Sequence, residues 1–195
     1  MSEPTLEDRF HLIGIGGAGM SVVAELLASR GATVEGSDRE DSAVLEHLRS
    51  VGVRVFVGHE ASHVDPASVV VVSTAIREDN PELAIARTRG QLVIHRSQAL
   101  ALAATGMRFV GVAGAHGKTS TSGMLAIALA ACGLDPSVAV GGVLPQLGTG
   151  AHLGGGDVFV AEADESDGSF LNYSPAIEIV TNVEPDHLDR YHSRE

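Results

Sequence analysis

The sequence contains no tryptophan, few other aromatic residues and a single cysteine. Cys132 therefore has no partner for an intrachain disulfide, and its apolar neighbours predict a small buried residue in a reducing compartment. A chain poor in aromatic but rich in aliphatic residues is typical of helices packed on parallel sheets of Val, Ile and Leu. We therefore expect an α/β protein.

Basic residues and long apolar runs are also scarce. The chain has 13 Lys and Arg against 25 Asp and Glu, a formal net charge of −12, so we expect no nucleic-acid partner. No run approaches the roughly 20 apolar residues of a membrane span, and residues 1–10 lack the apolar core of a secretory signal. These observations predict a cytoplasmic protein without a membrane partner, and no feature of the sequence indicates a protein partner.

Two glycine turns dominate the sequence, each between a predicted strand and a predicted helix. Residues 111–122, GVAGAHGKTSTS, follow the apolar run 107–112 and precede an apolar helical run. The backbone N–H groups of such a loop and the N-terminus of the next helix cradle phosphate groups. Lys118 can reach the β- and γ-phosphates, and Thr119 is placed to bind Mg²⁺. Val112 stands where a glycine is usual, yet the pattern still predicts ATP binding.

The other glycine turn follows a predicted strand near the start of the chain. Gly14, Gly16 and Gly19 match G-x-G-x-x-G, and Asp38 stands at the end of the next predicted strand, where a ribose-binding acid is found. Taken alone, this pattern favours a dinucleotide, with another nucleotide diphosphate or a structural turn as alternatives. An NAD-dependent oxidoreductase is therefore one hypothesis, although it leaves the second loop unexplained.

Strand and helix patterns alternate along the chain. We expect helices over residues 21–29, 42–50, 81–89 and 98–104, and strands over 33–36, 53–57, 69–72 and 92–94. This predicts a Rossmann-like parallel sheet domain at residues 1–105, followed by an incomplete P-loop α/β domain at 106–195 with three or four strands. The glycine-rich stretch 135–156 is expected to be a surface excursion with one short strand at 137–140.

Acidic and polar residues follow two predicted strands of the second domain. Glu162 ends the strand 157–162, and the strand 176–181 leads into Asn182 and His187. Because the carboxyl ends of parallel strands meet at one edge of a sheet, we expect these side chains to face the phosphate loop. Carboxylate oxygens suit divalent cations, whereas imidazole is an unusual ligand for Mg²⁺.

Five stretches of the sequence together resemble the Mur ligases of bacterial cell-wall synthesis. They are HLIGIGGAGMS from His11, GSD from Gly36, GAHGKTSTS from Gly114, AEADESDGSF from Ala161 and TNVEPDHLD from Thr181. These stretches span nearly the whole chain. One departure is Ala115, where the family usually has Thr; the change lies in the loop backbone and leaves Lys118 and Thr119 intact.

The resemblance implies a role for each loop. The first would bind the UDP part of UDP-N-acetylmuramic acid through Gly14, Gly16, Gly17, Ala18, Gly19, Met20, Asp38 and Ser73. The second would bind ATP through Gly114, Ala115, His116, Gly117, Lys118, Thr119 and Ser120. Lys118, Glu162 and His187 would be catalytic, and Thr119, Glu162 and His187 would bind Mg²⁺. The other histidines, among them His11, His59 and His63, are expected to be structural or surface residues.

The resemblance also implies a reaction. In this family ATP phosphorylates the lactyl carboxylate of UDP-N-acetylmuramate, and an amine then displaces phosphate from the acyl phosphate. Overall similarity favours L-alanine as the amine, with a recovered peptide as the alternative. The family's C-terminal domain, which binds the amino acid and closes over ATP, is expected to be absent from these 195 residues. We therefore expect the chain alone to be inactive as a ligase.

Overall fold

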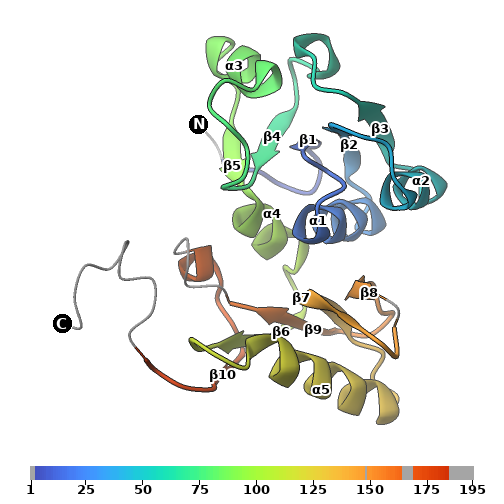
Figure 1. The fold of residues 1–195 in the computed structure, drawn as a ribbon, viewed down its shortest axis with the longest axis vertical. Helices are drawn as coiled ribbons and strands as arrows, with labels where there is room; N and C mark the ends of the chain where they lie inside the picture. Colours follow the sequence, from blue (N-terminus) through green and yellow to red (C-terminus); the bar gives the residue numbers. More distant parts are fainter. Residues whose placement is uncertain (1–2, 148, 164–168, 185–195) are drawn as a thin grey trace. The chain divides into compact units, whose positions relative to one another are not determined.

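The computed structural model describes residues 3–147, 149–163 and 169–184. The chain separates into two compact units, residues 1–103 (unit 1) and 104–195 (unit 2), and each contains a five-stranded sheet (Figure 1). The predicted fold class, a Rossmann-like parallel sheet followed by a P-loop α/β unit, is confirmed. No helix in the described part of either unit has the length and apolar character needed to cross a membrane.

Unit 1 is a parallel sheet of order β3-β2-β1-β4-β5. Its strands are β1 (Arg9–Ile13), β2 (Thr33–Asp38), β3 (Arg54–Val57), β4 (Val69–Val72) and β5 (Val93–His95). Its helices are α1 (Ala18–Ser29), α2 (Ala43–Ser50), α3 (Pro81–Thr88) and α4 (Arg96–Ala103), with a 3-10 turn η1 (Ala61–His63). Helix α1 packs against α2 and α4, whereas α3 packs against η1 on the other face of the sheet (Figure 1).

Local signals set the bounds of α3. Asn80 caps the helix, because its Oδ1 accepts the N–H groups of Glu82 and Leu83 at 2.9 and 3.2 Å. Pro81 occupies the first helical position, where its missing N–H costs nothing. Gly90 follows the helix with a φ of +66°, a left-handed conformation that favours glycine. The predicted helix start at Pro81 is therefore confirmed.

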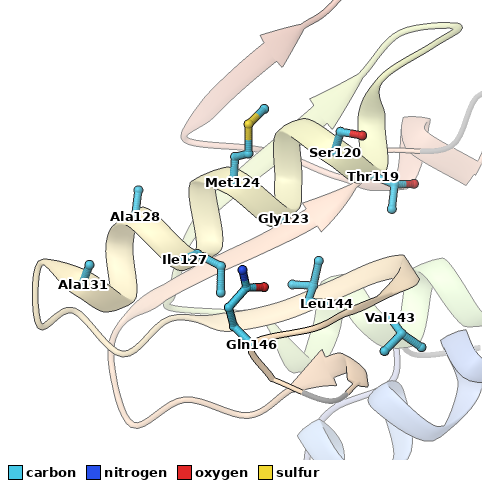
Figure 2. Close-up of a pocket in the computed structure, with 10 residues that line it drawn as sticks. All are labelled: Thr119, Ser120, Gly123, Met124, Ile127, Ala128, Ala131, Val143, Leu144 and Gln146. Atoms are coloured by element: carbon cyan, nitrogen blue, oxygen red, sulfur yellow. The ribbon is translucent and has the colours of Figure 1, made fainter.

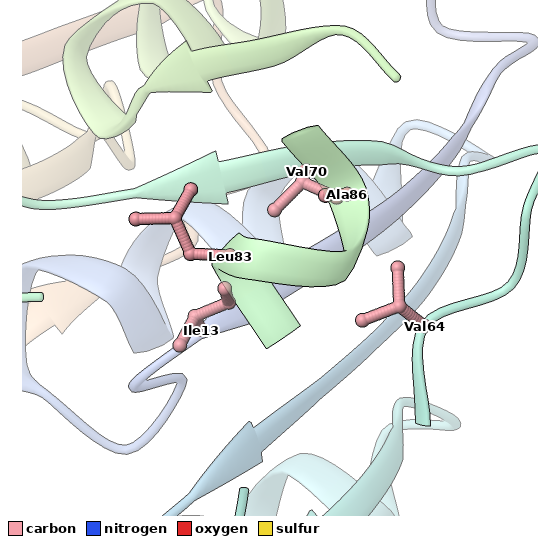
Figure 3. Packing of buried hydrophobic residues seen from close by; sticks show 5 residues of the cluster. All are labelled: Ile13, Val64, Val70, Leu83 and Ala86. Atoms are coloured by element: carbon pink, nitrogen blue, oxygen red, sulfur yellow. The ribbon is translucent and has the colours of Figure 1, made fainter. Parts of the chain in front are cut away.

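Aliphatic side chains fill the space between α3 and the sheet. Figure 3 shows them: Ile13, Val64, Val70, Leu83 and Ala86, each at most 2% exposed. Burying a Val, Leu or Ile side chain stabilises a fold by roughly 1.5–3 kcal/mol. This packing holds α3 against the sheet and with it Glu82, a carboxylate that has no exposed surface.

Unit 2 has the strand order β10-β6-β9-β7-β8. The strands are β6 (Arg108–Ala113), β7 (Ser137–Leu144), β8 (Thr149–His152), β9 (Val158–Glu162) and β10 (Ile177–Val180); the helix is α5 (Lys118–Ala131), and η2 (Ser169–Asn172) is a 3-10 turn. Strand β6 pairs in parallel with β9 on one side and β10 on the other, and α5 packs on β6, β7 and β9. The strand that enters the phosphate loop is therefore flanked by two strands whose carboxyl ends lie beside the loop.

Two predictions for unit 2 are wrong. The sheet has five strands rather than three or four, and the stretch 135–156 is more than a loop with one short strand. Strand β7 is eight residues long and turns back as the antiparallel strand β8, with Val138 opposite His152. The hairpin was not predicted because its glycines are typical of loops. The close approach of the two strands nevertheless requires glycine, since a Cβ built on Gly150 would lie 2.5 Å from the carbonyl oxygen of Gly142.

The expectation for Cys132 is also wrong. It is the C-cap residue of α5, and its side chain is exposed rather than buried. The residues around it at the end of the helix, 130–134, are exposed as well. An apolar composition therefore did not indicate burial here, because the last turn of α5 lies outside the packed part of the helix.

Candidate functional site

The phosphate loop connects β6 to α5 at the carboxyl end of the unit 2 sheet. Gly114 and Gly117 have φ values of +128° and +83°, conformations that other residues rarely adopt. A Cβ on Gly114 would also lie 2.2 Å from Oγ1 of Thr181. Gly117 is the N-cap residue of α5, where no side chain caps the helix and no acid lies in the first turn. This helix end is thus open to an anion.

Backbone N–H groups and a lysine gather at the start of α5. Within the described chain, the amides of Gly117, Thr119 and Ser120 have no hydrogen-bond acceptor. Nζ of Lys118 donates a 2.8 Å hydrogen bond to the carbonyl oxygen of Gly114, so its charge lies within the curve of the loop. Amides, the helix N-terminus and a lysine together form the type of cradle that binds a polyphosphate.

Two residues at the end of β10 hold this loop in place. Oδ1 of Asn182 accepts the N–H of His116 at 3.1 Å, and its Nδ2 donates to the carbonyl of His116 at 2.9 Å. Oγ1 of Thr181 donates to the same carbonyl at 2.6 Å. His116 therefore acts in the loop through its backbone. The sequence predicted that Asn182 faces the loop, but it assigned neither Thr181 nor Asn182 a role in binding.

Glu162 and Thr119, two predicted Mg²⁺ ligands, approach neighbouring glycines of β7. Oε1 of Glu162 accepts the N–H of Gly141 at 2.9 Å, and a Cβ on Gly142 would lie 2.9 Å from Cγ2 of Thr119. A carboxylate and a hydroxyl beside a phosphate loop fit Mg²⁺, which prefers oxygen ligands. His187, the third predicted ligand, lies outside the described residues. Within the described residues, no group of three or more His, Cys, Asp or Glu side chains is placed to hold a metal ion.

A groove of about 570 Å³ runs beside α5 (Figure 2). It begins at Thr119 and Ser120 and extends to Ala131, with Val143 and Leu144 of β7 opposite the helix. Beyond its first residues the lining is mostly hydrocarbon, which does not suit a polyanion. The phosphates of a nucleotide therefore belong at the loop end of the groove.

In unit 1, the end of β2 holds three successive amides of the first glycine turn. The N–H groups of Gly14 and Ile15 donate to the carbonyl of Ser37 at 2.8 and 2.9 Å. The N–H of Gly16 donates to Oδ2 of Asp38 at 2.8 Å. Asp38 thus positions the turn, and a carboxylate has further lone pairs that can accept a hydroxyl of a bound nucleotide.

Helix α1 begins after this turn without a capping side chain. Its N-cap residue is Gly17, and the first turn contains no acid. The amides of Met20 and Ser21 both donate to the carbonyl of Gly17. Those of Ala18 and Gly19 have no acceptor within the described chain. The start of α1 is a second helix end open to an anion.

The other residues of unit 1 that are predicted to bind the UDP-sugar differ in exposure. The side chain of Met20 is buried, so it anchors α1 and only its backbone can face a ligand. Ser73 is half-buried directly after β4. Because β4 pairs in parallel with β1, Ser73 lies on the same sheet edge as the glycine turn.

Both units match known protein families along their length. Residues 9–108 match the Mur ligase family, catalytic domain, and residues 112–195 match the Mur ligase middle domain. The chain belongs to the Mur ligase family. One Mur ligase, the UDP-N-acetylmuramate--L-alanine ligase of Renibacterium salmoninarum, is 57% identical over 187 residues, which are 96% of this chain and 40% of that protein. The chain thus spans about two fifths of the length of this relative.

Solved Mur ligases share this fold. The UDP-N-acetylmuramate-alanine ligase of Thermotoga maritima superposes with a TM-score of 0.80 at 34% identity, covering 95% of this chain and 44% of that one. The UDP-N-acetylmuramate:L-alanyl-gamma-D-glutamyl-meso-diaminopimelate ligase of Neisseria meningitides gives 0.81 at 30% identity, covering 93% and 62%. The resemblance to Mur ligases is therefore confirmed, and the NAD-dependent oxidoreductase hypothesis has no support.

Proposed function

We propose that the chain is the UDP-sugar-binding and ATP-binding part of a cytoplasmic ligase that joins L-alanine to UDP-N-acetylmuramate in peptidoglycan biosynthesis. The observation that carries this proposal is the 57% identity to the Renibacterium ligase, because the matched 96% of the chain takes in both units. The geometry supports it, since each glycine turn lies at the carboxyl edge of its own sheet and each leads into an uncapped helix.

In unit 1, the proposal places the diphosphate of the UDP-sugar at the start of α1. The turn from Gly14 to Met20 would surround it, and the amides of Ala18 and Gly19 would donate to phosphate oxygens. Asp38 and Ser73 would lie near the nucleoside. No redox chemistry is needed from this turn, although its glycine pattern is that of a dinucleotide site.

In unit 2, the proposal places ATP at the phosphate loop. The loop residues Gly114 to Ser120 would hold the phosphates, and Lys118 would neutralise part of their charge. Thr119 and Glu162, with His187, would hold Mg²⁺, which supplies neutralisation of the phosphoryl oxygens during transfer. The lactyl carboxylate attacks the γ-phosphorus, releasing ADP. The amine of L-alanine then attacks the acyl carbon, forming the amide and releasing phosphate and a proton.

A second candidate amine is a peptide. The Neisseria structure, whose name describes ligation of a tripeptide to UDP-N-acetylmuramate, superposes with a TM-score of 0.81. Its identity to this chain is 30%, against 57% for the Renibacterium L-alanine ligase. The fold does not separate the two candidates, because the solved alanine and tripeptide ligases superpose on this chain equally well. The higher sequence identity to the L-alanine ligase therefore keeps L-alanine as the proposed substrate.

Two measurements test this proposal. Titration calorimetry of the 195-residue chain should show saturable binding of UDP-N-acetylmuramate and of ATP with Mg²⁺, whereas saturable NADH binding without binding of the UDP-sugar would overturn it. A longer ligase that contains these residues should form UDP-N-acetylmuramoyl-L-alanine, detected by mass spectrometry. Faster ligation of the tripeptide than of L-alanine would replace the proposed amine with the second candidate.

A further inference from the structure

An arginine side chain lies at the open end of α1. Arg96 is the first residue of α4, the helix that packs against α1. A Cβ built on Gly19 would lie 2.4 Å from Nη1 of Arg96 and 3.4 Å from its Cζ. Because Cα–Cβ bonds in a helix tilt toward its N-terminus, this contact places the guanidinium on the side of Gly19 that faces the start of α1. Glycine at position 19 leaves the space that the guanidinium occupies.

This placement brings like charges together. The N-terminus of a helix carries the equivalent of roughly half an elementary positive charge. The half-buried Arg96 adds a full charge, and its guanidinium forms no ion pair or hydrogen bond with any described residue. The described chain supplies no anion to balance them: α1 has no acid in its first turn, and the two carboxylate oxygens of Asp38 accept backbone N–H groups instead.

We propose that Arg96 binds the diphosphate of the UDP-sugar together with the amides of Ala18 and Gly19. The inference rests on the proposed function, which puts UDP at this turn. A diphosphate converts the like-charge contact into an attraction and supplies acceptors for both amides, whereas uridine carries no charge. The planar guanidinium matches phosphate oxygens through two parallel hydrogen bonds, so arginine suits this position better than lysine.

The sequence alone gives Arg96 no role, because it follows β5, about 75 residues after the glycine pattern that would mark the site. The parallel pairing of β4 with β1 and of β5 with β4 brings the segment after β5 to the sheet edge where α1 starts. The position of Arg96 in α4 then follows from the packing of α4 on α1.

The test is titration calorimetry of the 195-residue chain and its Arg96→Ala variant with uridine, UDP and UDP-N-acetylmuramate. We expect Arg96→Ala to bind UDP and the UDP-sugar about 10- to 100-fold more weakly, as for the loss of a charge-assisted bidentate contact. Binding of uridine, which has no phosphate, should change by less than about twofold. Arg96→Lys keeps the charge but lacks the planar guanidinium, and it should bind UDP and the UDP-sugar about 3- to 10-fold more weakly.

Arg87→Ala is the matched control. Arg87 lies in α3 on the other face of the unit 1 sheet, where its exposed side chain pairs with Glu78. Removing it changes the net charge by the same amount and should leave UDP binding unchanged. Raising the salt concentration should weaken UDP binding to the parent chain more than to Arg96→Ala, because one charge contact has been removed from the variant.

The outcomes separate this inference from the proposed function. If the parent chain does not bind the UDP-sugar, the proposed function fails and the role of Arg96 fails with it. If the parent binds but Arg96→Ala binds UDP with parent affinity, the inference alone is overturned. An equal loss for uridine and UDP would also overturn it, because that pattern indicates a disturbed fold. Should Arg96→Ala not fold, Arg96→Gln is measured against the same three ligands.

Discussion

The hydroxyl of Ser37 donates a 2.5 Å hydrogen bond to Oε2 of Glu82, a carboxylate with no exposed surface. The backbone carbonyl of Ser37 accepts the amides of Gly14 and Ile15 in the first glycine turn. One residue at the end of β2 thereby connects the candidate UDP-sugar site to a buried charge on α3.

Glu82 is also the centre of a histidine cluster. Its Oε2 lies 3.1 Å from Nε2 of His11, and its Oε1 lies 3.1 Å from Nδ1 of His63. Nδ1 of His59 lies 2.9 Å from Oγ of Ser37, which completes the network. A buried carboxylate is stable only when donors satisfy it, so these side chains support the fold as a set.

Glu82→Ala should destabilise unit 1 by about 3 kcal/mol, because it leaves buried donors without their acceptor. Both tyrosines, at positions 173 and 191, belong to unit 2, so their fluorescence does not report on unit 1. Hydrogen exchange of the β1 and β2 amides, followed by mass spectrometry, is the suitable measurement. Glu78→Ala, which removes an exposed carboxylate shortly before the same helix, should change these rates little. Similar acceleration in both variants would contradict this assignment.

The buried cluster should also make the stability of unit 1 depend on pH. Burial opposes a charge on His11, but Glu35 and Glu82 outweigh it and raise the pKa of His11 above its ordinary 6.5. Burial likewise opposes a charge on Glu82, yet donors led by His11 and Ser37 lower its pKa below the ordinary 4.5. The stabilisation from protonated His11 is therefore complete below pH 6.5 and is lost as pH rises through its raised pKa. That from ionised Glu82 is complete above pH 4.5 and is lost as pH falls through its lowered pKa.

We therefore expect unit 1 to be most stable between about pH 5 and 6.5 and to lose stability toward pH 8. Scanning calorimetry at pH 6 and pH 8 should show the unit 1 transition at a lower temperature at the higher pH. His11→Gln should remove most of this difference, because it removes the imidazole whose pKa is raised. A parent transition that does not move between pH 6 and pH 8 would refute the role of His11.

What the sequence could predict here depends on how far apart the interacting residues lie in the chain. The loop from Gly114 to Ser120 and the helix start at Pro81 depend on neighbours within a few residues, and both were predicted. Glu82 meets His11 across 71 residues and Asn182 meets His116 across 66, so no local spacing indicates either contact. The β7–β8 hairpin was missed for another reason, since its glycines allow close strand approach but are typical of loops.

Asn182→Ala should weaken ATP binding by about tenfold, as for the loss of two hydrogen bonds that fix the loop. Both hydrogen bonds join the Asn182 side chain to the backbone of His116, so the effect acts through loop conformation. Calorimetric titration of the 195-residue chain with ATP and Mg²⁺ measures it. Glu178→Gln, at an exposed position of β10, is the control and should bind ATP like the parent. Unchanged ATP affinity in Asn182→Ala would show that the loop keeps its shape without these two hydrogen bonds.

Lys118→Ala should abolish measurable ATP binding while UDP-N-acetylmuramate binding changes by less than about twofold. The loss follows because Lys118 is the charged residue within the curve of the phosphate loop, where its Nζ lies 2.8 Å from the carbonyl oxygen of Gly114. The two affinities are expected to be independent because the two glycine turns belong to separate sheets, each with its own helix and its own core.

Titrating Lys118→Ala with both ligands gives the two affinities. Arg96→Ala should show the opposite pattern, with weaker UDP-sugar binding and unchanged ATP binding. If Lys118→Ala weakened both ligands equally, the two sites would share one pocket or the substitution would disturb the fold, and hydrogen exchange of the β6 amides would distinguish these explanations.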